Sequence, residues 1–96
     1  MVAEGSTGGR AAPSSRALKL LAKTKASRND WSPEHYHRLL TGFGFLPREG
    51  SKHTVYVDPS DSDNFVIVPR HARIRGYIAA EAIEAIEKAW PTVGEE

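Results

Sequence analysis

The spacing of apolar residues changes twice along this chain, and this order limits the possible folds more than any other feature. Helical spacing is seen at Tyr36, Leu39, Leu40 and Phe43, and again at Ala79, Ile83, Ile86 and Trp90. Between these two stretches, segments 45–48, 52–58 and 64–69 have the composition of strands, with breaks at Gly50 and at 58–64. The sequence therefore predicts a helix, three antiparallel strands and a second helix.

The first of these helices has clear start signals. Ser32 is a typical N-cap, Pro33 occupies the first helical position, and Glu34 lies near the positive end of the helix dipole. Trp31 and Tyr36 are spaced for a hydrophobic staple that would clamp the helix entry.

The polar face of the same helix carries two histidines. His35, His37 and Arg38 are expected to face solvent, and Gly42 and Gly44 to end the helix. His35 and His37 are two residues apart and lie on different sides of a helix, so they do not form a metal-binding pair. We interpret both as surface residues.

The middle predicted strand has an alternating pattern that suits a sheet covered on one face. Val55 and Val57 alternate with polar or aromatic neighbours, and His53 shares their parity. Residues 65–68 are apolar on both parities, so the pattern leaves open which face is buried. We expect a two-layer α+β domain with both main helices on one sheet face and the other face free.

Two charged patterns have structural interpretations. The spacing of Asp61 and Asp63 is that of a calcium loop, but the glycine and the final glutamate of such a loop are missing. We therefore expect a solvated hairpin loop at this point. In the last helix, Glu84 and Lys88 are spaced as an i, i+4 ion pair.

Composition divides the chain into a disordered tail (1–15), a basic helix with its linker (16–30), a globular domain (31–91) and a short tail (92–96). The first thirty residues carry six basic and two acidic side chains, whereas the last twenty carry one basic and five acidic. The pattern does not decide whether the basic helix packs on the domain edge or contacts RNA or a partner.

Cysteine is absent, so disulfides and cysteine-bound zinc are excluded. No stretch approaches the roughly 18 apolar residues that a membrane span needs. We expect a soluble cytoplasmic protein without a membrane contact, a metal or another cofactor.

The residues with chemical potential gather at two strand ends. Ser51, Lys52 and His53 enter the middle strand, and Arg70 and His71 leave the third. In an antiparallel hairpin, the start of one strand lies beside the end of its neighbour, so these residues are expected at one edge of the sheet. Lysine and arginine bind phosphate, and histidine changes its charge near neutral pH.

Such a cluster suits metal-independent RNA cleavage, in which a base activates the ribose 2′-hydroxyl and cations stabilise charge on the phosphate. By spacing alone, binding of the RNA backbone without cleavage is the favoured interpretation.

The segments 39–45 (LLTGFGF), 50–53 (GSKH) and 68–71 (VPRH) resemble the HicA family of bacterial toxins, and the resemblance extends from Trp31 to Trp90. It implies a fold like the double-stranded RNA-binding domain (dsRBD), in the order α-β-β-β-α. It also implies an endoribonuclease that cuts messenger RNA as the toxin of a type II toxin-antitoxin system, with a HicB-like antitoxin as its protein partner.

On this resemblance His53 is the catalytic residue, and Ser51 shapes the turn that presents it. Lys52 and Arg70 would hold phosphate, and His71 is a candidate for a second proton transfer. The acidic last helix is expected on the side away from RNA. The alternative function is a non-catalytic RNA-binding module of the same fold.

Overall fold

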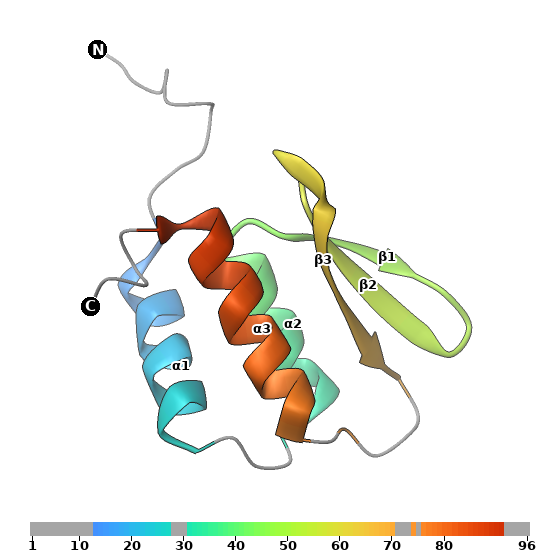
Figure 1. Ribbon diagram of the computed structural model, residues 1–96. Helices are drawn as coiled ribbons and strands as arrows, with labels where there is room; N and C mark the ends of the chain where they lie inside the picture. The colour runs from blue at the N-terminus through green and yellow to red at the C-terminus, as the bar shows by residue number, and fades with distance from the viewer. Residues whose placement is uncertain (1–12, 28–30, 71–73, 75, 92–96) are drawn as a thin grey trace.

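The computed structural model describes residues 13–27, 31–70, 74 and 76–91. Its elements in chain order are α1 (Ser15–Ala26), α2 (Pro33–Gly42), β1 (Leu46–Glu49), β2 (His53–Asp58), β3 (Asp61–Pro69) and α3 (Gly76–Ala89) (Figure 1). The predicted order of helix, three strands and helix, preceded by a basic helix, is confirmed. Of the predicted tail at 1–15, residues 1–12 lie outside the described residues, as do 28–30 and 92–96. The tail is shorter than predicted, because Ser14 caps α1 and Ser15 begins it.

The protein is an α+β domain with one antiparallel sheet in the order β1-β2-β3. Helices α2 and α3 cover one face of the sheet, and α1 packs against both of them (Figure 1). The buried strand residues on the covered face are Thr54, Tyr56, Asp58, Asn64, Val66 and Val68. The sequence pattern did not decide which face of the sheet is buried. The structure shows that Val55 and Val57 lie on the uncovered face.

Serine caps begin both N-terminal helices. The Ser14 hydroxyl accepts a hydrogen bond from the Ala17 amide at 3.1 Å, and the Ser32 hydroxyl accepts one from the His35 amide at 3.2 Å. Pro33 stands at the start of α2 as predicted, and Gly42 is its last residue.

The basic helix α1 is part of the packed structure. Its residues Ala17, Leu21 and Thr24 are buried, and Lys25 forms an ion pair with Glu87 of α3 at 2.9 Å. Of the two interpretations of this helix, the structure shows the packed one. A contact of α1 with RNA or with a partner stays a prediction.

Trp31 at the entry to α2 makes contacts that the sequence pattern does not predict. The Trp31 ring stacks on His35, with ring centroids 4.1 Å apart, and its indole nitrogen donates to the Ser27 carbonyl. His35 was predicted to face solvent, but it is half-buried between α1 and α2. The reason is a hydrogen bond of 2.7 Å between His35 Nε2 and the Thr24 hydroxyl.

That hydrogen bond fixes the tautomer of His35. The single hydroxyl proton of Thr24 is donated to the Leu20 carbonyl at 2.7 Å, so His35 Nε2 must be the donor. Burial, followed by the charges of Lys23 and Arg38, lowers the pKa of His35. The neutral imidazole is therefore the form that joins the two helices.

The predicted loop at 58–64 is wrong in its extent. Strand β3 already begins at Asp61, and only Pro59 and Ser60 form the turn. The physical reason is Asp58, whose buried carboxylate accepts bonds from the Ser60 amide at 3.0 Å and hydroxyl at 2.8 Å. This side chain closes the turn, which the composition of the loop does not reveal.

Helix α3 packs as the spacing of its apolar residues predicts, because Ala79, Ile83 and Ile86 are buried. The Trp90 indole donates to the Phe43 carbonyl at 2.8 Å and so joins the end of α3 to the end of α2. The predicted Glu84–Lys88 ion pair does not form between these two described residues.

Close packing of α1 on the end of α2 gives a stability prediction. A Cβ atom on Gly42 would lie 3.0 Å from Ala17 Cβ. We therefore expect Gly42→Val to lower the free energy of unfolding by about 1–3 kcal/mol through overpacking. The measurement is urea unfolding, with Ala22→Val on the exposed side of α1 as control, for which helix propensity costs about 0.5 kcal/mol. Equal losses in the two variants would contradict this packing.

The lowered pKa of His35 gives a prediction of pH dependence. Below pH 6.5 the unfolded chain binds the proton more readily than the folded protein, so stability is complete above that pH and decreases as the pH falls. Urea unfolding at pH 7.5, 6.5 and 5.5 measures this, with His35→Gln as the reference that lacks the titrating group. The wild type should lose more stability than the variant over this range; parallel losses would refute the assignment.

Candidate functional site

The loop between β1 and β2 lies beside the end of β3, and backbone hydrogen bonds hold it there. The Gly50 amide donates to the His53 carbonyl at 2.8 Å, and the Arg70 amide donates to the Lys52 carbonyl at 2.9 Å. His53 is the register partner of Pro69. The predicted convergence is therefore confirmed for Ser51, Lys52, His53 and Arg70, which we call the cationic end of the sheet. His71 lies outside the described residues.

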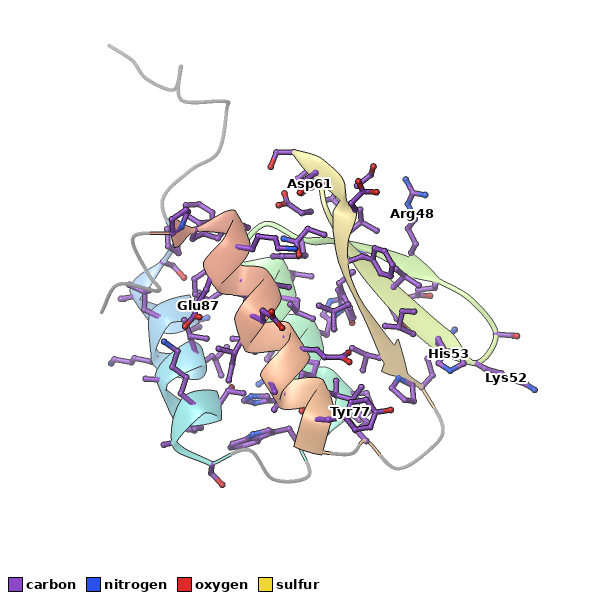
Figure 2. All side chains as sticks on the ribbon, in the orientation of Figure 1. Arg48, Lys52, His53, Asp61, Tyr77 and Glu87 are labelled. Carbon is purple, nitrogen blue, oxygen red and sulfur yellow. The ribbon has the colours of Figure 1, made fainter. Side chains whose placement is uncertain are left out.

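The Arg70 side chain connects the two sides of this end. Its Nη1 donates to the Gly50 carbonyl, so the guanidinium spans from the end of β3 to the β1–β2 loop. Arg70, Ser51 and Lys52 are all exposed. Figure 2 shows Lys52 extending away from the body of the protein. A phosphate group can therefore reach both cations from solvent.

His53 is an exposed residue at the first position of β2 (Figure 2). Its parity is that of Val55 and Val57, which places it on the uncovered face of the sheet. No hydrogen bond or ion pair joins its imidazole to the rest of the described chain. Both ring nitrogens are therefore accessible to a ligand.

Arg48 is a further cation on this side of the sheet, and the sequence reasoning gave it no role. It pairs with Val55 in the register of β1 and β2, and its side chain points away from the helices (Figure 2). The signal that would have found it is strand parity, since a residue opposite an outward valine also points outward. The short strand β1 alone carries too little pattern to show this.

The uncovered face is apolar in its middle. Leu46 is 56% exposed, Phe65 49% and Ile67 44%. They surround Val55 and Val57, which are half-buried. We call these five residues, together with Arg48 and His53, the open face.

His37 is separated from His53 by the sheet. Its Nδ1 lies 3.0 Å from the hydroxyl of Tyr56, a residue of the covered face. Burial, with a smaller contribution from the charge of Glu49, raises the pKa of Tyr56. Among the described residues, no second histidine lies with His53 at the cationic end.

An acidic groove lies elsewhere, between β3 and α3. It has a volume of about 310 Å³ and is lined by Asp63, Asn64, Phe65, Glu81, Glu84, Ala85 and Lys88. Helix α3 packs on the sheet face opposite His53, which agrees with the expected position of the acidic helix.

In the part of the chain that the structure describes, no three histidine, aspartate or glutamate side chains gather as metal ligands would. No described helix has the length and apolar character of a membrane span.

Comparison of the chain with protein-family models, with curated proteins and with solved structures finds no match.

The hydrogen bond from the Arg70 side chain to the Gly50 carbonyl should restrict the motion of the β1–β2 loop. Replacing Arg70 with Met removes the side-chain bond to the Gly50 carbonyl, and the loop should open more often. We expect the Gly50 amide to exchange with solvent about fivefold faster, corresponding to about 1 kcal/mol for one hydrogen bond. Hydrogen exchange followed by NMR measures this, with Lys52→Met as the control that removes a charge without removing this bond. Unchanged exchange in Arg70→Met would contradict the contact.

Proposed function

We propose that this protein is a metal-independent endoribonuclease in which His53 transfers protons at the cationic end of the sheet. The observation that carries the proposal is that the exposed imidazole of His53, which is not hydrogen-bonded to any other described residue, lies at the same end of the sheet as Lys52 and Arg70. Histidine titrates near neutral pH, and guanidinium and ammonium groups bind the phosphodiester.

The chemistry follows from this arrangement. The ribose 2′-oxygen attacks the adjacent phosphorus while a base removes its proton, and the bond to the 5′-oxygen breaks as that oxygen takes up a proton. His53 supplies or accepts one of these protons. The Arg70 guanidinium and Lys52 neutralise the charge that develops on the phosphoryl oxygens. DNA lacks the 2′-hydroxyl and would be bound without being cut.

The wider proposal is a HicA-like toxin with a dsRBD-like fold. The order α2-β1-β2-β3-α3 supports it, as do segments 50–53 and 68–70, which meet at the cationic end. In this proposal, the protein acts on messenger RNA in the cytoplasm, and a HicB-like antitoxin inhibits it by covering the cationic end. His71 remains a candidate for the second proton transfer.

A second candidate function is RNA binding without cleavage. The observation that favours it is the solitary position of His53, since the described residues at the cationic end offer no second histidine beside it. Acid–base catalysis of phosphodiester cleavage needs both a proton acceptor and a proton donor. The two candidates share the same surface and differ in whether the RNA is cut.

Cleavage of end-labelled RNA in excess chelator separates the candidates. We expect the wild type to cut and His53→Gln to lose about 100-fold or more in rate, as the removal of a general acid or base does. His37→Gln is the matched control, because His37 is an exposed histidine on the covered side of the sheet. It should retain wild-type cleavage.

Three outcomes would contradict a part of this proposal. If wild type and His53→Gln bind RNA equally and neither cuts it, the binding module is the correct function. If chelator abolishes cleavage, the reaction is not metal-independent. If His37→Gln and His53→Gln lose activity equally, the cleavage does not depend on the cationic end.

A further inference from the structure

Strand β3 is an edge strand, because it comes last in the order β1-β2-β3. The hydrogen bonds at the cationic end show which of its backbone groups point toward β2. The His53 carbonyl accepts from the Gly50 amide, on the side of β1, whereas the Lys52 carbonyl accepts from the Arg70 amide, on the side of β3. Residues 52, 54 and 56 therefore bond toward β3, and 53, 55 and 57 bond toward β1.

The register then identifies the backbone groups on the outer edge of β3. Thr54 and Tyr56 pair with Val68 and Val66, so these two valines bond to β2. The intervening residues of the edge, at positions 65 and 67, direct both their N–H and their C=O groups away from β2. No described strand pairs with this side of β3, so these backbone groups lack a strand partner among the described residues.

Both ends of this outer edge are closed to further pairing. The Asp61 carboxylate accepts the Asp63 amide at 3.1 Å, and Pro69 has no N–H group to donate. Such devices commonly protect edge strands from pairing with other chains. Here they leave the stretch from Phe65 to Ile67 open, and the side chains of these two residues are 49% and 44% exposed.

The acidic groove between β3 and α3 adjoins the same stretch of β3 (Figure 1). Phe65 is part of its lining, and the exposed carboxylates of Glu81 and Glu84 form its wall on α3. Together with Asp63, three carboxylates face a single ammonium group, that of Lys88. A chain that lies along this edge therefore meets a negatively charged wall.

We propose that the outer edge of β3 binds an extended basic segment of a partner protein as a fourth strand of the sheet. The segment runs antiparallel to β3, and its backbone bonds to the free groups of Phe65 and Ile67. Residues directly opposite these two share their face of the sheet and are apolar. Residues between them point to the side of α3, where lysine or arginine pairs with Glu81 and Glu84.

The charge of the groove selects this occupant over two others. If the β3 edges of two copies of this chain paired, their acidic grooves would come together, and like charges facing each other are destabilising. RNA would be repelled by the carboxylates for the same reason. A basic strand supplies both the backbone groups that the edge needs and the charge that Glu81 and Glu84 need.

This inference goes beyond the proposed nuclease and does not depend on it. The residues that carry it lie on the outer edge of β3 and on α3, whereas the nuclease proposal rests on the cationic end. The test therefore measures peptide binding in the absence of RNA.

The probe is a blocked nine-residue peptide in which valine alternates with lysine. NMR of the full ¹⁵N-labelled chain, titrated with this peptide up to about 1 mM at low salt, covers the range of weak binding. We expect saturable shifts of the Phe65 and Ile67 amides. At saturation, hydrogen exchange of these two amides should slow about tenfold or more.

Two control peptides separate charge from strand pairing. In one, glutamate replaces lysine, which reverses the charge at the positions beside α3. In the other, the valine amides are N-methylated, which keeps the charge and removes the donors that face β3. Each should bind about tenfold or more weakly than the probe, since the first loses the ion pairs and the second the backbone bonds.

Charge reversal in the protein tests the wall of the groove. The double variant Glu81→Lys/Glu84→Lys should bind the probe about tenfold or more weakly than the wild type. Glu34→Lys/Glu49→Lys is the matched control, because it makes the same change in net charge at exposed positions on α2 and β1. It should bind as the wild type does, and circular dichroism confirms that both variants fold.

Five results would overturn the inference. No binding of the probe by the wild type up to about 1 mM refutes it. Equal binding of the glutamate peptide excludes a basic segment, and equal binding of the N-methylated peptide excludes strand addition. Equal losses in the two double variants reduce the effect to net charge. If the Phe65 and Ile67 amides become protected with rising protein concentration and no peptide, the edge binds a second copy instead.

Discussion

The hydrogen bonds to the buried carboxylate of Asp58 are the interactions on which the rest of the sheet depends. Asp58 is 3% exposed, and it accepts hydrogen bonds from Ser60 and, at 3.4 Å, from the Asn64 side chain. A buried carboxylate is costly without such partners, so the chain is held in the conformation that supplies them. Asn64 also donates to the Ala85 carbonyl at 3.0 Å, which fastens the turn to α3. This network keeps the turn short and sets how β2 pairs with β3.

That pairing decides what each face of the sheet presents. A slip of one residue would exchange the two faces of a strand, moving Val66 and Val68 outward and Phe65 and Ile67 inward. In the observed register, the core receives the two valines. The larger apolar residues are left on the open face, and Arg70 comes to lie beside the β1–β2 loop. The core and the candidate site are thus consequences of one register.

Sequence reasoning succeeded where the determining interactions are local. The start of α2 at Ser32 and Pro33 follows from backbone hydrogen bonding within one helical turn. The convergence of Lys52, His53 and Arg70 follows from antiparallel pairing alone. Sequence reasoning failed at His35, which a helical wheel places on the polar side of α2. There the competing interaction is a bond to Thr24 of another helix, eleven residues away.

The sequence by itself determined the order of helices and strands, the N-cap of α2, and the gathering of cations at one end of the sheet, because periodicity and turn chemistry act over a few residues. Only the tertiary structure decided which sheet face is covered and that Arg48 shares the open face. It also set the half-buried position of His35. These features depend on contacts between distant elements, and an apolar pattern on both parities of a strand is compatible with either face.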